Sequence, residues 1–253
     1  MSREWLSGHD RGMLDPFVGA RGTGATHRTR TGAAMFAGHL AVAMAAKRVE
    51  PKLGLGSTVA ASFALDLVWP VLLLTGLERV RVNPGDTAFT NLAFESYPWT
   101  HSLAMVFVWS VCVAVVVRLV TGATRSGLVL GSLVLSHWVL DWVTHRPDLP
   151  LWPGGPVTGL GVWNSIPATL VVEGGVLLAG VALYLSVTKA RDRTGKLALG
   201  GLLALTVAVW ASQPWAPLPD SPDAVAWGAL VLWVLWPWAA WVERHRAIRP
   251  SPE

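Results

Sequence analysis

The sequence predicts an all-α fold, a polytopic transmembrane bundle of about six to seven helices. Two observations carry this prediction. Of the 253 residues, 52% are hydrophobic and only 14% are charged, whereas a soluble domain has roughly 25% charged residues. Apolar segments of membrane-spanning length also recur along most of the chain, separated by short loops rich in Pro, Gly, Arg and Trp. We therefore expect a single membrane domain over residues 35–245 and a short cytoplasmic tail over residues 246–253.

Uninterrupted apolar content places seven candidate spans in this domain. They run over residues 35–47, 58–77, 101–121, 126–144, 166–187, 197–213 and 224–242. The first is too short to cross a bilayer comfortably, so we expect a tilted or partly re-entrant helix whose ends are covered by neighbouring helices. No internal repeat is evident, so the sequence gives no support to an inverted-repeat transporter.

Residues 1–34 differ from the rest of the chain because they are polar and lack the continuous apolar core of a signal peptide. We predict a disordered tail that is dispensable for insertion, with Met35 as an alternative start of translation. The segment from Gly19 to Gly24 resembles a phosphate-binding loop, but no strand precedes it. A flexible tail is therefore the favoured interpretation.

The basic residues and the single cysteine exclude several classes of function. The net charge is +4, and its Lys and Arg residues are spread over loops rather than gathered in one patch with aromatic residues. Membrane lipids are thus expected partners and nucleic acid is not. Cys112 lies inside an apolar span and is the only cysteine, which excludes an intramolecular disulfide and a cysteine-based zinc site. We interpret it as a small buried apolar side chain.

Basic residues also predict the orientation in an inner (plasma) membrane, because they favour the cytoplasmic side. The ends expected inside carry Lys47, Arg48, Lys52, Arg125, Lys189, Arg191, Arg193, Lys196, Arg244, Arg246 and Arg249. The opposite loops carry fewer basic residues and hold Trp99, Trp152, Trp163 and Trp215 at interfacial depth. We expect those loops to face outward.

Ionisable residues within the spans are the candidate functional groups, since each costs about 2.5–3.5 kcal/mol to insert. They are His39, Asp66, His101, His137, Asp141 and Glu173, with His145 at the end of the fourth span. In the predicted orientation, the first six fall at similar depth in the outer leaflet. One shared polar cavity is a consistent explanation, although each group could instead form an interhelical hydrogen bond or ion pair.

The strongest local pattern is His137-Trp-Val-Leu-Asp141-Trp-Val-Thr-His145. Steps of four residues keep these side chains on one face of a helix. An imidazole and a carboxylate one turn apart can bind the same cation, and this pair suits Zn²⁺, Mn²⁺ or Fe²⁺. The pattern therefore predicts a divalent metal site that includes His137 and Asp141, with Zn²⁺ as the first choice.

Several segments resemble those of the membrane-bound metal-dependent hydrolases, also called the LexA-binding, inner-membrane-associated hydrolases. The resemblance covers residues 35 to about 245 and rests on Gly38-His39, Leu65-Asp66-Leu67, Trp99-Thr100-His101-Ser102 and Ser136-His137-Trp-Val-Leu-Asp141. It implies a helical bundle, a divalent metal held by His and Asp residues, and hydrolysis as the reaction. This chain has only Asp66 where an acidic pair is usual in the family, so we expect one metal ion.

A hydrolase mechanism assigns a role to each candidate. Three ligands drawn from His39, Asp66, His101, His137 and Asp141 would leave a coordination position open for water. Glu173 would act as general base, Arg146 would hold an anionic group, and His145 would meet solvent or substrate at the helix end. A phosphoester or lipid-like substrate suits a cavity at headgroup depth. The alternatives are an ion- or proton-coupled transporter and a non-catalytic structural membrane protein.

Overall fold

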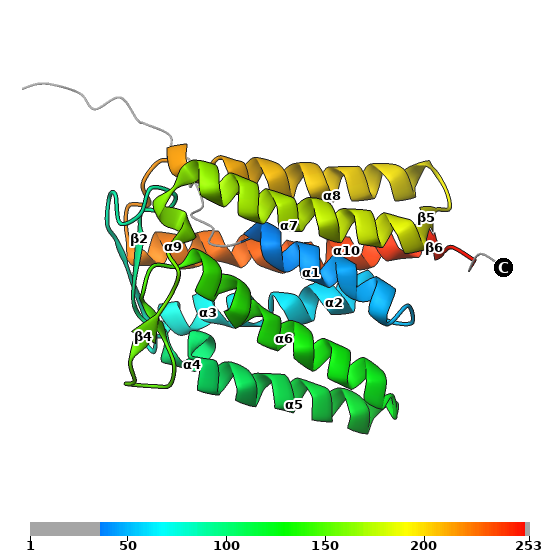
Figure 1. Cartoon of the computed structure of the whole chain (residues 1–253), viewed down its shortest axis with the longest axis horizontal. Helices are drawn as coiled ribbons and strands as arrows, with labels where there is room; N and C mark the ends of the chain where they lie inside the picture. Colours follow the sequence, from blue (N-terminus) through cyan, green and yellow to red (C-terminus); the bar gives the residue numbers. More distant parts are fainter. Residues whose placement is uncertain (1–35, 251–253) are drawn as a thin grey trace, which may run out of the picture.

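Helices make up most of the computed structural model, which describes residues 36–250 (Figure 1). The α-helices are α1 (Phe36–Val49), α2 (Leu55–Ser62), α3 (Ala64–Leu74), α4 (Pro98–His101), α5 (Leu103–Thr121), α6 (Thr124–Thr144), α7 (Ile166–Val187), α8 (Arg193–Ala211), α9 (Pro222–Ala229) and α10 (Leu235–Arg244). Three short 3₁₀ helices are η1 (Val162–Asn164), η2 (Gln213–Trp215) and η3 (Leu230–Val234). The predicted all-α transmembrane class is confirmed. The expectations for the polar tail lie outside the described residues.

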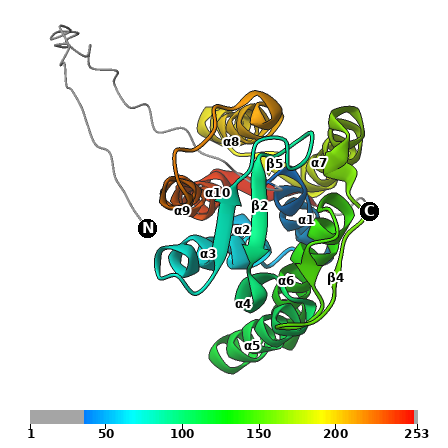
Figure 2. The same cartoon turned by 90° about the vertical axis from the view of Figure 1, so that its left-hand side faces the viewer.

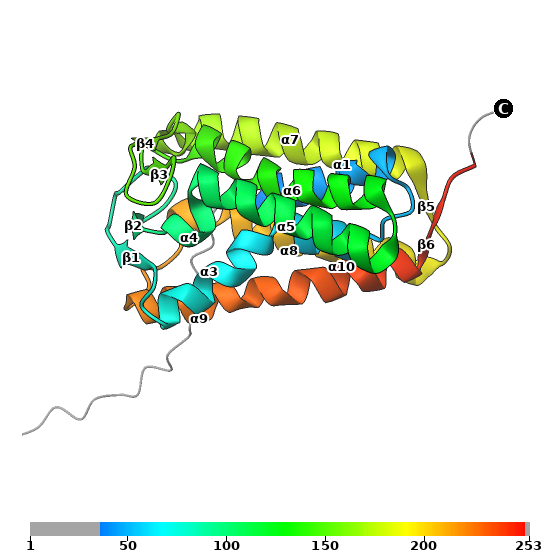
Figure 3. The same ribbon diagram turned by 90° about the horizontal axis from the view of Figure 1, so that it is seen from below.

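Five helical segments within residues 36–250 are long and apolar enough to cross a membrane. They are α5, α6, α7, α8 and the run from α9 through η3 to α10, which Figure 3 shows lying lengthwise along the bundle. Helices α2 and α3 form a sixth span if they are counted together, but they are bent by 49° at their junction. The predicted span over residues 58–77 is therefore a broken helix, and the break places Asp66 in the first turn of α3.

Helix α1 accounts for the short first span. Its 14 residues extend about 21 Å at 1.5 Å per residue, less than the roughly 30 Å of a hydrocarbon core. It lies at the centre of the bundle beside α2, α6 and α7 (Figure 2), and Leu40, Ala43 and Met44 are fully buried. Helix α1 approaches α7 closely at Gly180, where a Cβ atom would lie 2.3 Å from the carbonyl oxygen of Ala41. The helix is thus short and packed among its neighbours, whereas its tilt or partial re-entry in the membrane stays a prediction.

Helices α5 and α6 form an antiparallel pair at one side of the bundle (Figure 1). Their connection begins at Gly122, whose φ of 71° is favourable only for glycine and ends α5. Gly127 and Gly131 then lie one turn apart on α6 and let the backbone of α5 approach, since a Cβ on either would lie less than 3 Å from a carbonyl oxygen of α5.

Cys112 corrects one prediction. It is exposed on α5 rather than buried, because α5 packs on α6 through one face and leaves most of its apolar side chains at the molecular surface. In a bilayer this surface contacts lipid, which is an apolar environment as well. An apolar span of uniform composition does not indicate which of its faces is buried.

The end of the bundle predicted to face outward carries two hairpins where the sequence predicts only loops. Strand β1 (Arg79–Val82) pairs with β2 (Leu92–Ser96), and β3 (Leu149–Pro150) pairs with β4 (Val157–Thr158). The two loop regions are joined by an ion pair between Arg146 Nε and Asp86 Oδ2 at 2.8 Å. A backbone hydrogen bond from Phe89 to Trp163, 3.0 Å long, adds a second connection. These loops therefore form one layer over the end of the bundle.

The helix ends that carry most of the basic residues lie together at the end of the bundle opposite the two hairpins. Strand β5 (Thr188–Ala190) pairs there with β6 (Arg246–Ile248). The buried Lys47 forms an ion pair with Glu243, and Arg125 Nε lies 3.1 Å from Glu50 Oε2. The structure thus groups the loops as the basic-residue pattern predicts. The side of the membrane that each group faces stays a prediction.

Cysteine labelling is expected to fix that side. In a background with Cys112→Ala, cysteines at the exposed Pro153 and Pro217 should react with an impermeant maleimide added to intact cells. A cysteine at the exposed Arg193 should react only after permeabilisation, because the positively charged loop is retained in the cytoplasm. Labelling of position 193 in intact cells would reverse the orientation and move the hairpin layer to the cytoplasmic side.

Candidate metal centre

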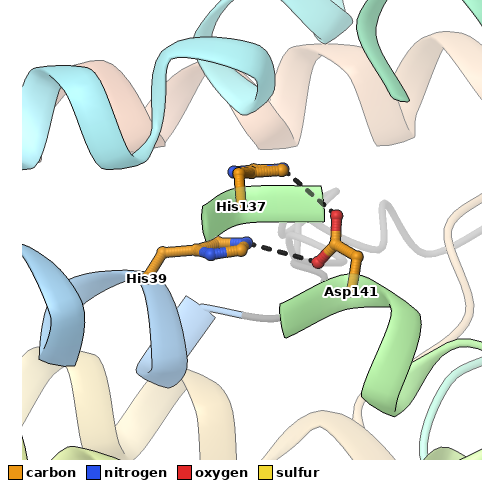
Figure 4. Close-up of side chains that lie close together, drawn as sticks. All are labelled: His39, His137 and Asp141. Atoms are coloured by element: carbon orange, nitrogen blue, oxygen red, sulfur yellow. Dashed lines mark ion pairs between the residues drawn. The ribbon is translucent and has the colours of Figure 1, made fainter. Parts of the chain in front are cut away.

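Four helices bring five ionisable side chains to one place inside the bundle. His39 lies on α1, Asp66 in the first turn of α3, and His101 at the end of α4, while His137 and Asp141 lie one turn apart on α6. Figure 4 shows His39 and His137 directed toward the Asp141 carboxylate. The sequence proposed these five residues as metal ligands, and the structure brings all five together. We call them the His/Asp cluster.

The cluster presents the Nε2 atom of every imidazole to carboxylate oxygens. Asp141 has its Oδ1 3.3 Å from His39 Nε2 and its Oδ2 3.2 Å from His137 Nε2. Asp66 has its Oδ1 3.6 Å from His101 Nε2 and its Oδ2 3.8 Å from His39 Nε2. Two overlapping sets of three could each hold an ion, namely His39, His137 and Asp141, and Asp66, His101 and His137.

These distances are compatible with a bound cation as well as with direct His–Asp contacts. Neighbouring ligand atoms around one ion, at bonds of about 2.0–2.2 Å, lie roughly 3.0–3.6 Å apart, close to the 3.2–3.8 Å found here. Within residues 36–250, every ion-pair partner of Asp66 and Asp141 is a histidine. Two buried carboxylates without Lys or Arg require protons or a bound cation for charge compensation.

The hydrogen bond of His137 defines which of its nitrogens is free. Its Nδ1 lies 2.9 Å from the backbone carbonyl oxygen of Ser62, and a carbonyl oxygen can only accept. Nδ1 therefore carries the proton, and in the neutral ring Nε2 presents a lone pair to the cluster. Ser62 is the last residue of α2 and its hydroxyl donates to the carbonyl oxygen of His39 at 2.7 Å. The end of α2 thus orients the His137 ring and binds the backbone of α1 at His39.

The three residues predicted to catalyse lie outside both candidate ligand sets. Glu173 on α7 is fully buried; its Oε1 accepts a hydrogen bond from Trp163 Nε1 at 3.1 Å, and its Oε2 has no hydrogen-bond partner among the described residues. Arg146 pairs through Nε with Asp86 and, at 3.3 Å, with Asp148. Its charge is therefore already compensated by two carboxylates. His145 Nδ1 lies 3.0 Å from Asp148 Oδ1.

An aromatic layer separates the His/Asp cluster from the hairpins. The His145 ring lies 4.8 Å from that of Phe94 and 4.4 Å from that of Trp163, and the buried Tyr97 ring lies 5.2 Å from that of His101. Burial, together with the Asp148 carboxylate, raises the pKa of Tyr97 well above its usual value. The Tyr97 hydroxyl therefore stays protonated and donates to Asp148 Oδ1 at 3.0 Å.

Sequence reasoning missed Glu78, which lies between α3 and β1 and is buried. Its Oε1 accepts hydrogen bonds from the backbone N–H groups of Trp99 and Thr100, and its Oε2 accepts one from the Thr100 hydroxyl. An acidic residue just after an apolar span resembles a solvated loop residue, so its burial could not be read from the sequence. The only sequence feature that could have indicated a partner for His101 was the adjacent Thr100.

Comparison with known proteins identifies the family. The sequence model of the YdjM inner membrane protein family matches residues 23–216, a region that contains the whole His/Asp cluster as well as His145, Arg146 and Glu173. Comparisons with curated proteins and with solved structures find no match. The family description names a location and no reaction. Since the match covers most of the chain and the bundle contains several helices of membrane-spanning length, the protein is a multi-pass inner membrane protein of the YdjM family.

Proposed function

We propose that this protein is a membrane-embedded, metal-dependent hydrolase. The observation that carries the proposal is the His/Asp cluster, in which three imidazoles and two carboxylates form two overlapping sets of three that could each hold an ion. Mixed nitrogen and oxygen ligands favour Zn²⁺ over Mg²⁺ or Ca²⁺, which prefer oxygen alone. His39, Asp66, His101, His137 and Asp141 would hold the cation, and we expect Zn²⁺.

The five side chains of the cluster differ in exposure, and this difference indicates the side from which a substrate would approach. The side chains of His39 and His137 are each 1% exposed and that of Asp141 is 3% exposed, whereas those of Asp66 and His101 are 10% and 7% exposed. A substrate would therefore approach on the side of Asp66 and His101. When bound, a divalent cation supplies Lewis-acid chemistry by activating water and polarising the bond to be cut.

The neighbouring residues extend this proposal. Glu173 offers an unpartnered Oε2 in a fully buried position and is proposed to accept the proton of the attacking water. His145 and Arg146 lie in the loop layer, where Arg146 bonds two aspartates. We propose that Arg146 binds an anionic substrate only after the substrate has displaced one of these two aspartates.

A phosphoester or lipid-like substrate is proposed from the position of the cluster. The cluster lies near the end of the bundle that carries the hairpins, and apolar side chains of α5 and α7 form the surface around the bundle. A lipid-like molecule can place its chains along such a surface and its head at the depth of the cluster. Membrane lipids are therefore the proposed source of substrate.

The transporter alternative requires polar groups along the bundle. Buried charges of the described chain at the opposite end contact one another or backbone groups, as when Lys47 bonds Glu243 and the carbonyl oxygen of Leu53. Toward that end, the buried residues Met44 on α1 and Leu199 and Leu202 on α8 are apolar. This separation favours a site with one opening over a path across the membrane.

Elemental analysis and a hydrolysis assay test the proposal. Protein purified without chelator should carry about one equivalent of Zn²⁺, as expected of one set of ligands. It should release phosphate from phosphatidic acid, or glycerol, glycerol phosphate or fatty acid from phosphatidylglycerol, in mixed micelles, and activity should be lost with a chelator and return with Zn²⁺. Protein that stays metal-free after supplementation would favour the structural alternative. Bound metal without hydrolysis of these esters would retain the site and reject the hydrolase assignment for this substrate class.

A further inference from the structure

We propose that Glu78 and Thr100 are positioning residues that hold His101 in the tautomer needed to bind a cation through Nε2. Glu78 is 1% exposed and Thr100 is fully buried. Neither belongs to the His/Asp cluster, and Glu78 lies 22 residues before Thr100 in the chain. The effect on cation affinity rests on the proposed metal site, whereas the tautomer itself can be measured without any metal.

The Glu78 carboxylate accepts three hydrogen bonds from described residues. Its Oε1 accepts from the backbone N–H of Trp99 at 2.8 Å and from that of Thr100 at 2.9 Å. Its Oε2 lies 2.7 Å from the Thr100 hydroxyl. A carboxylate can only accept, so the single hydroxyl hydrogen of Thr100 is directed to Glu78.

This assignment leaves the Thr100 oxygen as an acceptor toward His101. The distance from Thr100 Oγ1 to His101 Nδ1 is 2.6 Å, and the hydroxyl hydrogen is already donated elsewhere. Nδ1 of His101 must therefore carry the proton and donate. In the neutral ring, Nε2 then has a free lone pair directed at Asp66 Oδ1 and at His137 Nε2, which lie 3.6 and 3.3 Å away.

Different partners thus hold His101 and His137 in the same tautomer. Ser62 fixes the proton of His137 on Nδ1 through a backbone carbonyl, and Glu78 fixes that of His101 through a hydroxyl. Two Nε2 lone pairs facing each other at 3.3 Å repel unless a cation or an additional proton lies between them. Outer partners of this kind typically change metal affinity by 10–100-fold.

Thr100 offers a substitution that separates positioning from folding. Thr100→Val keeps the shape of the side chain and the two backbone hydrogen bonds to Glu78 Oε1, but it removes the hydroxyl between Glu78 and His101. Thr100→Ser restores that hydroxyl and serves as the rescue variant. Thr121→Val is the matched control, because the Thr121 hydroxyl donates to Val117 on the exposed end of α5, outside the cluster.

The first measurement is the tautomer in metal-free protein. Protein with ¹⁵N-labelled histidine is compared by NMR, and the His101 signals are identified by their loss in His101→Gln. Wild type, Thr100→Ser and Thr121→Val should all show a protonated Nδ1 on His101. Thr100→Val should move the proton to Nε2 or give a mixture. A fully protonated Nδ1 in Thr100→Val, as in wild type, would overturn the proposal that Glu78 and Thr100 set the tautomer of His101.

The second measurement is Zn²⁺ affinity by competition with a chromophoric chelator. Thr100→Val and Glu78→Gln should weaken binding by about 10–100-fold, while Thr100→Ser and Thr121→Val should stay close to wild type. Unchanged affinity in Thr100→Val would overturn the positioning role even if the tautomer shifts. If wild-type protein binds no Zn²⁺, the proposed function is rejected instead. The NMR result would still decide whether Glu78 and Thr100 set the tautomer of His101.

Discussion

His137→Ala and Asp141→Asn are each expected to yield protein without bound metal. Asp141 contacts three histidines through its two oxygens, with His39 on one and His101 and His137 on the other. His137 belongs to both candidate ligand sets. Removing His137 therefore disrupts both sets, whereas removing Asp141 disrupts one set and also takes a carboxylate contact from all three histidines. We expect affinity for Zn²⁺ to fall by more than about 100-fold, beyond the effect of an outer hydrogen-bond partner.

The chain contains a matched control for these variants. His245 and Asp192 form another histidine–aspartate pair, with 2.8 Å between Nδ1 and Oδ2, at the opposite end of the bundle. His245→Ala and Asp192→Asn should therefore retain the wild-type metal content. Both cluster variants should still insert and elute as monodisperse protein, since neither adds charge to the membrane. Full metal occupancy in both cluster variants would remove the chemical basis of the hydrolase proposal.

Gly180→Val is expected to cause the largest loss of stability among single substitutions in α7. A Cβ at this position would lie 2.3 Å from the carbonyl oxygen of Ala41 and 2.6 Å from its Cα, both backbone atoms that cannot rotate away. Helix α1 would have to move from α7, at a cost of about 1–3 kcal/mol or more for overpacking. His39 lies just before Ala41, so this movement should also weaken metal binding. Thermal unfolding in detergent and Zn²⁺ titration measure the two effects.

Gly175→Val tests whether the effect comes from the close approach. Gly175 lies on the same helix, and a Cβ there would meet nothing within 4 Å. This variant should therefore unfold near the wild-type temperature and bind Zn²⁺ normally. Equal destabilisation by the two substitutions would mean that loss of glycine in α7, rather than contact with α1, is responsible.

The sequence by itself determined the membrane class and the chemistry of the candidate site. Ionisable residues are costly in a bilayer, so His39, Asp66 and Asp141 stand out against apolar neighbours. The spacing of His137 and Asp141 then predicts a shared helical face from local geometry alone. Both arguments use only composition and positions close in the chain, which is why they needed no tertiary structure.

Tertiary structure decided which distant residues meet. It placed α1 at the centre of the bundle, exposed Cys112 on α5, and joined α1, α3, α4 and α6 at one cluster. It also buried Glu78, whose partners lie more than 20 residues later in the chain. Burial and side-chain hydrogen bonds of this kind depend on the faces that packed helices turn toward one another, and those faces are set by long-range contacts that no local pattern records.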